Sequence, residues 1–417
     1  MIETIGFQTY EPRLAENRLE WVNSKLNPTK QNIPMIFYSD GSPAVEINRY
    51  AVDYAKLYPQ APQAKTLLSK INHLNSYIEF LEREGLYWRY FPRNKSESVL
   101  FKFRQYLIGR RDSGGIAPST ANARMNAVVG FYRYAQSQGW IQKNLWQEKS
   151  AKISIVTAIG FERAVGIKFT NLTIPYRKRN SLDTVEDGLV PLSAEDKSTL
   201  LDVAIQGNCH LYLMLQIGFI TGARSETIRT LNKNQLLNAT LSSDGFYRMT
   251  VGPGTGILTK FSVNGELQIP KQLYDVLCGY SVSEIRASRS LKANNKYKDL
   301  IFLTTHGNPY SKNTLNQLIF ELKASLFSHG YQQFKNFHFH QTRATAITER
   351  MLVSIEVYGI KDYKAIESTR LFAMHKSEAT TWRYFKFIES KPKRSAAGNA
   401  FIDYIFGLDK ISNKFNR

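Results

Sequence analysis

Apolar residues recur at intervals of three and four through residues 46–148, and this spacing predicts helices. Within residues 64–82 the repeat places one apolar stripe along a helix. Its members are Leu67, Leu68, Ile71, Leu74, Ile78 and Leu81. A second helix is expected to begin near residues 118–120, because a serine or threonine there can cap the backbone donors of a first turn. Its stripe is Met125, Val128, Val129, Tyr132 and Ala135, and Gly139 favours its end. We therefore predict a helical bundle over residues 46–148.

The charge balance of the chain points to a polyanionic partner. The 417 residues include 55 Lys and Arg against 35 Asp and Glu, a formal net charge of +20. Such an excess favours nucleic acid first and an anionic membrane surface second. The longest apolar stretch, residues 211–220, contains Gln216 and is too short to span a bilayer, and the N-terminus lacks the apolar core of a signal peptide. We expect a soluble cytoplasmic protein with no membrane partner, placed beside the nucleoid if the source is bacterial.

Basic side chains gather in two regions. In the predicted bundle they are Arg110, Arg111, Arg124 and Arg133. In the extended segment 149–190 they are Arg177, Lys178 and Arg179, which precede an acidic turn at residues 183–187. Both sets are suited to following a phosphate backbone. A solvated helix face and an ordinary linker explain them equally well, so both interpretations stay open.

The first 45 residues and the two cysteines say little about function. Residues 33–47 predict two short strands around the turn Asp40-Gly41, within an extension that either contacts DNA or supports the bundle. Cys209 and Cys278 are predicted to be buried free thiols in a reducing cytosol. No CxxC pair is present, which excludes a zinc site built on cysteines.

A second domain is predicted over residues 191–390. Ser193 followed by Asp196 resembles a capping box, and a helical pattern continues to Ile220. A strand-rich stretch covers residues 245–269, and the pattern is mostly helical from residue 314 onward. The expected fold class is α+β and mainly helical, with a small antiparallel sheet in this domain. Residues 391–417 are predicted to form a tail with a short apolar helix at residues 401–407. Pro392 is expected to end the helix that precedes the tail.

Three clusters in the second domain carry chemically useful side chains. The first is TGAR, which ends in Arg224; the second is HQTR, with His340 and Arg343 on one helix face. The third spans residues 374–384 and contains His375 and Tyr384. Each cluster by itself is common in proteins, because single histidines and tyrosines most often serve packing. The glycine-rich segment 252–256 lacks the Gly-Lys-Ser/Thr ending of a nucleotide-binding loop, so no cofactor is expected.

The three clusters in this order resemble the tyrosine recombinases, the phage-integrase family. The similarity runs over residues 191–390 and extends more loosely to 46–148, which resembles that family's helical, SAM-like core-binding domain. The resemblance implies the catalytic residues Arg224, Lys260, His340, Arg343, His375 and Tyr384. Lys260 is matched to the family's hairpin lysine, and Lys271 ranks lower because it follows the sheet. The family also implies double-stranded DNA as substrate and a homotetramer on paired DNA sites, with no metal or ATP.

The resemblance assigns a role to each group, and elementary chemistry agrees. A tyrosine hydroxyl with a reference pKa near 10 is a weak nucleophile, so Tyr384 needs a neutralised phosphate. Arg224 and Arg343 would clamp the non-bridging oxygens. The two histidines and the lysine would handle protons and hydrogen bonds: His340 as acid or base, His375 as a donor, and Lys260 as the acid for the leaving 5′ oxygen. The products would be a 3′-phosphotyrosyl bond and a free 5′ hydroxyl.

The chain departs from the family pattern at several positions. Thr227 stands where an acidic residue is frequent, Ala344 replaces a histidine, and Met374 replaces a glycine. Two alternative functions stay open: a topoisomerase-like or protelomerase-like enzyme, and a non-catalytic DNA-binding regulator. The sequence also leaves open whether the tail packs in cis or in trans, which mobile element is moved, and whether an accessory bending or directionality factor takes part.

Overall fold

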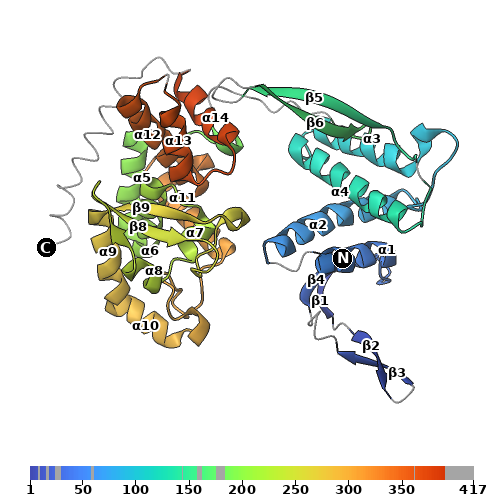
Figure 1. Cartoon of the computed structure of the whole chain (residues 1–417), viewed down its shortest axis with the longest axis horizontal. Helices are drawn as coiled ribbons and strands as arrows, with labels where there is room; N and C mark the ends of the chain where they lie inside the picture. Colours follow the sequence, from blue (N-terminus) through green and yellow to red (C-terminus); the bar gives the residue numbers. More distant parts are fainter. Residues whose placement is uncertain are drawn as a thin grey trace. The chain divides into compact units, whose positions relative to one another are not determined.

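The computed structural model divides into two compact units, Met1–Lys178 and Arg179–Arg417 (Figure 1). The structure describes residues 1–7, 10–15, 18–23, 30–57, 61–142, 144–156, 162–174, 184–360 and 362–389. The basic run Arg177, Lys178 and Arg179 and the tail 391–417 lie outside the described residues.

The first unit is built around four helices. They are α1 (Val45–Leu57), α2 (Ala61–Arg83), α3 (Val99–Asp112) and α4 (Pro118–Ser137), with the 3-10 turn η1 (Lys95–Glu97) before α3. Both predicted stripes lie in one apolar core, although Leu68 is 41% exposed on the opposite side of α2. The buried hydroxyls of Tyr77 and Tyr132 lie 2.6 Å apart in this core, so each phenol has a polar partner. The predicted helical bundle is confirmed.

The N-terminal strands pair differently from the prediction. β1 (Ile2–Phe7) pairs antiparallel with β4 (Lys30–Ile36), and β2 (Tyr10–Ala15) pairs with β3 (Arg18–Asn23). The predicted second strand after Asp40-Gly41 is wrong, because only the bridge Phe37–Pro43 forms before α1 begins. The side-chain amide of Asn48 on α1 exchanges hydrogen bonds with the backbone of Ile36, whose carbonyl also accepts from the N–H of Ala44.

The segment predicted as an extended connector contains a hairpin. β5 (Glu148–Val156) and β6 (Glu162–Thr170) pair antiparallel over their whole length, with Glu148 opposite Thr170. The first part of the extended segment is therefore a β-hairpin.

The second unit combines helices with a three-stranded antiparallel sheet in the order β7-β8-β9. The strands are β7 (Thr240–Leu241), β8 (Phe246–Val251) and β9 (Gly265–Pro270). In the described part of this unit, five helical elements precede the sheet in the chain: η2 (Glu186–Gly188), α5 (Ala194–Gly207), α6 (Cys209–Thr221), α7 (Ser225–Arg229) and α8 (Lys233–Leu237). The short helix η3 (Lys260–Ser262) lies between β8 and β9, and α9 (Lys271–Val282) and α10 (Glu284–Lys292) follow β9. After them come η4 (Asn295–Tyr297), α11 (Lys312–Ser328), η5 (Gln332–Asn336), α12 (His340–Tyr358), α13 (Tyr363–Ala373) and α14 (Glu378–Glu389). The predicted α+β class, mainly helical with small antiparallel sheets, is confirmed.

Helix α6 is the centre of this unit. It is apolar around its whole circumference, which is typical of a helix surrounded by protein. The Asn208 side chain caps its first turn, and the predicted cap at Ser193 is present on α5. Helix α12 packs directly on α6, where a Cβ on Gly218 would lie 2.3 Å from the Thr342 hydroxyl. This close approach brings the TGAR and HQTR segments together.

The prediction of two buried thiols is wrong. Cys209 is exposed and Cys278 is half-buried. Cys209 is the first residue of α6, whose apolar surroundings begin one residue later at His210 and Leu211. Among the described residues, no helix has the length and apolar character needed to cross a membrane.

Candidate active site

Arg343 is held at the junction of three helices. It lies on α12 and is 1% exposed. Its Nη1 donates to the carbonyl of Gly222 at 2.6 Å, and its Nη2 donates to the carbonyl of Ala373 at 2.7 Å. These carbonyls belong to the C-terminal ends of α6 and α13, where partial negative charge is highest. The guanidinium is thereby fixed, and its Nε remains for another acceptor.

The TGAR turn positions the second guanidinium. Gly222 ends α6 with φ of 64°, a left-handed conformation that glycine adopts without strain. The chain then continues extended through Arg224, which is the N-cap residue of α7. The Arg224 side chain is 19% exposed. Its charge is therefore partly buried but still accessible from solvent.

His375 follows a second left-handed residue. Met374 at the end of α13 has φ of 49°, which explains why a glycine suits this position. The Met374 side chain occupies the space beside Gly265 at the start of β9, where a Cβ would lie 2.4 Å from the sulfur. The ring of His375 is buried, and its Nδ1 lies 2.9 Å from the Thr381 hydroxyl. This contact orients Nε2 toward Arg343 and Glu186.

Tyr384 lies on α14 and has no exposed surface. Its ring stacks on His375 with centroids 5.9 Å apart and planes at 26°. Apolar side chains of α12, α13 and α14 surround it, together with Val185. These three helices contact one another on one side of the second unit (Figure 1). Packing therefore fixes the phenol, and its hydroxyl points toward Glu186.

Glu186 occupies the centre of this cluster. Its Oε2 lies 3.4 Å from the Tyr384 hydroxyl and 3.5 Å from Nε2 of His375. The same oxygen is 3.8 Å from Nε of Arg343, and Oε1 is 3.9 Å from Nη2 of Arg224. Four groups proposed from the sequence thus face one carboxylate within a single unit.

The sequence analysis did not select Glu186. The available signals were the acidic turn at residues 183–187 and the missing acidic residue at Thr227. Thr227 is buried, so its position offers no carboxylate to the site. The acidic group comes instead from a segment well before the TGAR turn.

The electrostatics of the cluster depend on burial and on this carboxylate. Burial alone would raise the pKa of Glu186, but His375, Arg343 and Arg224 hold it well below the usual range. Burial lowers the pKa of Arg343 to about 10, with a further decrease from Arg224. Burial also lowers the pKa of His375. The pKa of Tyr384 is raised, first by burial and then by the charge of Glu186.

Lys260 and His340 are less closely integrated into the cluster. Lys260 is exposed and lies in the loop that joins β8 and β9. Phe261 and Ser262 have positive φ angles, so this segment is not a regular strand. The cations of Lys260 and Lys376 both lie over the Phe261 ring, at 5.2 and 6.0 Å, which links this loop to the segment after His375. His340 is the first residue of α12 and is half-buried. Across the described ranges, no cluster of His, Cys, Asp and Glu is suited to a metal ion.

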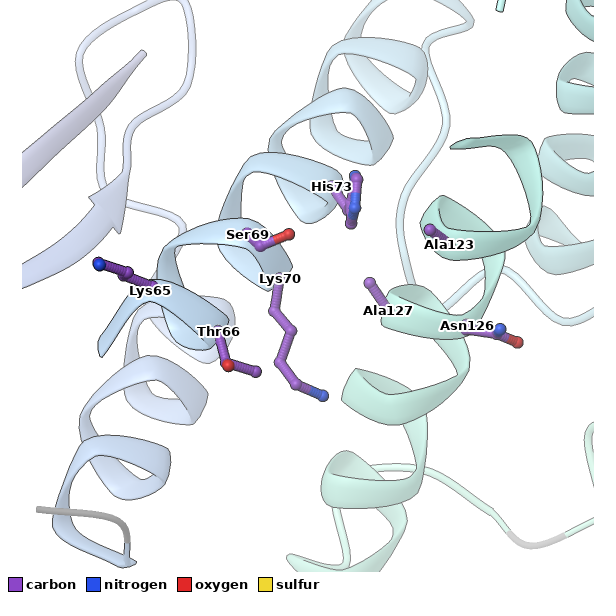
Figure 2. A pocket seen from close by; sticks show the side chains of 8 residues that line it. All are labelled: Lys65, Thr66, Ser69, Lys70, His73, Ala123, Asn126 and Ala127. Atoms are coloured by element: carbon purple, nitrogen blue, oxygen red, sulfur yellow. The ribbon is translucent and has the colours of Figure 1, made fainter. Parts of the chain in front are cut away.

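The first unit carries a basic groove between α2 and α4 (Figure 2). Its volume is about 500 Å³, and Lys70 extends into the space between the two helices. The lining side chains are Lys65, Thr66, Ser69, Lys70, His73, Ala123, Asn126 and Ala127. Burial and the nearby charge of Arg124 lower the pKa of His73. The groove residues of α2 repeat at intervals of three and four beside the apolar stripe, a polar pattern that the sequence already contains.

The four arginines predicted on this bundle have different surroundings. Arg124 lies beside the groove, close enough to His73 to affect its pKa. Arg110 donates to the Tyr106 hydroxyl, Arg111 pairs with Asp112, and Arg133 pairs with Glu148. The structure therefore associates one of the four with the groove.

Comparisons with known proteins identify the fold. No family model matches the sequence, and no curated protein matches it. Among solved structures, the Tn1549 transposon integrase in complex with transposon right end DNA has 16% identity and a TM-score of 0.50, covering 84% of this chain and 99% of that one. The same integrase with circular intermediate DNA has 15% identity and a TM-score of 0.50, covering 81% and 94%. A lambda integrase dimer bound to a core site has 15% identity and a TM-score of 0.48, covering 83% and 96%.

The chain has the tyrosine recombinase, or integrase, fold. The resemblance stated from the sequence is confirmed at this level. No family model supports a narrower assignment.

Proposed function

We propose that this chain is a site-specific DNA recombinase or integrase that cuts and rejoins DNA through a 3′-phosphotyrosyl intermediate. The observation that supports the proposal best is the convergence of Arg224, Arg343, His375 and Tyr384 on one anion position inside the second unit. Two guanidiniums beside a buried phenol suit a phosphodiester whose charge must be neutralised before attack.

In the proposed reaction, the Tyr384 oxygen attacks the scissile phosphorus. The bond from phosphorus to the 5′ oxygen breaks, and a 3′-phosphotyrosyl bond forms in its place. Arg224 and Arg343 neutralise the non-bridging oxygens, and His375 donates a hydrogen bond to one of them. His340 accepts the phenolic proton, and Lys260 protonates the leaving 5′ oxygen. The covalent bond retains the energy of the phosphodiester, so rejoining by reversal requires neither metal nor ATP.

Double-stranded DNA is the proposed partner of both units. The groove between α2 and α4 offers Lys65, Lys70 and the neighbouring Arg124 to phosphates. Assembly as a homotetramer on paired sites and a role in moving a mobile element follow from the resemblance, and the printed name of the Tn1549 transposon integrase is in keeping with such a role.

Covalent trapping tests the proposal. The full chain is incubated with suicide or sheared source-replicon DNA, without metal or ATP, and SDS-resistant, protease-sensitive adducts are counted. We expect an adduct for the wild type and none for Tyr384→Phe. The matched control is Tyr363→Phe, because Tyr363 is 56% exposed on α13 and outside the cluster.

Two results would redirect the proposal. Absence of any adduct on DNA that the wild type binds would favour a non-catalytic DNA-binding regulator. An adduct accompanied by relaxation of supercoiled DNA, with no joint molecules between two sites, would indicate a topoisomerase-like reaction.

A further inference from the structure

Glu186 has the charge and the position of the phosphate that the proposed reaction requires. Its carboxylate is the shared neighbour of the phenol, the His375 ring and both guanidiniums. A phosphodiester placed for attack by Tyr384 would need the same donors. Two anions sharing one set of cations at such distances repel each other.

The contacts of the carboxylate are loose. Separations of 3.5 to 3.9 Å from the three cationic or ring nitrogens exceed the 2.7–3.2 Å of an N–H···O hydrogen bond. Nε of Arg343 and Nε2 of His375 are buried and have no hydrogen-bond partner among the described residues. The other nitrogens of Arg343 are used by two carbonyls, and Nδ1 of His375 is used by Thr381. The site therefore keeps two buried nitrogens, Nε of Arg343 and Nε2 of His375, that have no hydrogen bond of ordinary length with Glu186.

The backbone that carries Glu186 is fixed, whereas its side chain can turn away. Val185 is buried among the helices of the site, its N–H donates to the Leu189 carbonyl at 2.8 Å, and Leu189 packs on the same apolar cluster. Glutamate has three rotatable side-chain bonds, and a carboxylate not held by a short hydrogen bond can change rotamer without moving the turn.

We propose that Glu186 is an internal phosphate substitute, which occupies the anion position of the DNA-free enzyme and is displaced by the scissile phosphate. The inference rests on the proposed function and adds a regulatory step to it. Without DNA, the carboxylate balances Arg224 and Arg343 and keeps a negative charge against the phenol. Entry of a phosphate exchanges one anion for another and places oxygens beside Nε of Arg343 and Nε2 of His375. The anion position is therefore open to DNA only when the carboxylate leaves it.

The test compares the full-length wild type with Glu186→Gln, which keeps the shape of the side chain and removes its charge. The matched control is Glu284→Gln, an exposed glutamate in the first turn of α10. In single-turnover trapping at subsaturating suicide DNA, we expect Glu186→Gln to form adduct about tenfold faster than wild type, which corresponds to an activation free energy lower by about 1.4 kcal/mol. The control should match the wild type. Slower adduct formation by Glu186→Gln would overturn the proposal and make Glu186 a permanent part of the catalytic set.

A DNA-free measurement separates this inference from the proposed function. Inorganic phosphate is titrated into each protein while the melting temperature is recorded. We expect phosphate to stabilise Glu186→Gln more than wild type, because the competing carboxylate is absent. Equal responses in the two proteins would overturn the substitute role even if DNA is cleaved. A larger response in the variant, with no adduct from either protein, would support the substitute role and reject the cleavage reaction.

A second substitution guards against misfolding. Glu186→Asp keeps the charge and shortens the side chain by one methylene, so its carboxylate is withdrawn from the phenol. We expect adduct formation at a rate between those of the wild type and Glu186→Gln. A rate below wild type for both variants, measured well below the melting temperature of each protein, would contradict displacement.

Discussion

Nη1 of Arg343 donates a 2.6 Å hydrogen bond to the carbonyl of Gly222, across a separation of 121 residues. Because Gly222 is the residue that turns the chain from α6 toward Arg224, one contact sets the positions of both guanidiniums. The geometry of the anion site therefore depends on a backbone carbonyl as well as on charged side chains.

Gly222→Ala is expected to destabilise the fold and to lower cleavage. An alanine would retain φ near 64° at a cost of roughly 1–2 kcal/mol, and its Cβ would lie 3.2 Å from the Phe372 ring. The matched control is Gly245→Ala, which has φ of 81° with open space around the Cβ. Urea unfolding should show a larger loss for Gly222→Ala than for the control, and trapping should be reduced only in the former. Equal losses and equal trapping would show that the added methyl group does not disturb the turn at residue 222.

Gly265→Ala and Met374→Gly should show strong coupling in a double-mutant cycle. The added Cβ overlaps the Met374 sulfur, and overpacking typically costs about 1–3 kcal/mol. Removing the methionine side chain opens that space and relieves the left-handed strain at residue 374. The loss caused by Gly265→Ala should therefore be smaller in the Met374→Gly background, as measured by urea unfolding. Additive effects would mean that the two side chains do not share the space.

The stability of the DNA-free protein should depend on pH through Glu186. Its pKa in the folded protein lies below the unfolded value of 4.5, because Arg224, Arg343 and His375 outweigh burial and the neighbouring Tyr384. A depressed carboxyl pKa contributes stability that is present above pH 4.5 and is lost as the pH falls toward the folded value. We expect Glu186→Gln to be less stable than wild type at pH 7, with a difference that narrows below pH 4.5. Guanidinium unfolding of both proteins at several pH values measures this, and a constant difference would argue against ionised Glu186.

Lys70→Gln should weaken DNA binding in a salt-dependent manner. Loss of one phosphate contact is expected to lower the slope of log affinity against log salt by about 0.9. Arg133→Gln is the comparison, because Arg133 already pairs with Glu148 outside the groove. Fluorescence anisotropy with a DNA duplex at several salt concentrations should show the reduced slope for Lys70→Gln alone. A reduced slope for Arg133→Gln instead would place the DNA surface away from the groove.

Local sequence patterns predicted much of the fold. The stripes of α2 and α4, the cap at Ser193 and the helical character of residues 314–389 depend on interactions within a few residues, and all are present. The predicted strand after Asp40-Gly41 is reduced to the bridge Phe37–Pro43 because α1 begins at Val45 and packs its Asn48 side chain on the end of β4. The predicted burial of Cys209 failed because the apolar surroundings of α6 begin one residue later. In both cases the deciding contact belongs to a neighbouring element.

The sequence by itself determined the helical periodicity of the chain, its positive charge, and the types and order of the groups in the three clusters. Only the tertiary structure decided that Arg224, Arg343, His375 and Tyr384 face one point, and that Glu186 stands there. The physical reason is the range of the interactions. Periodicity and capping are set by neighbours along the chain, whereas Tyr384 and Glu186 are 198 positions apart and meet through the packing of α12, α13 and α14.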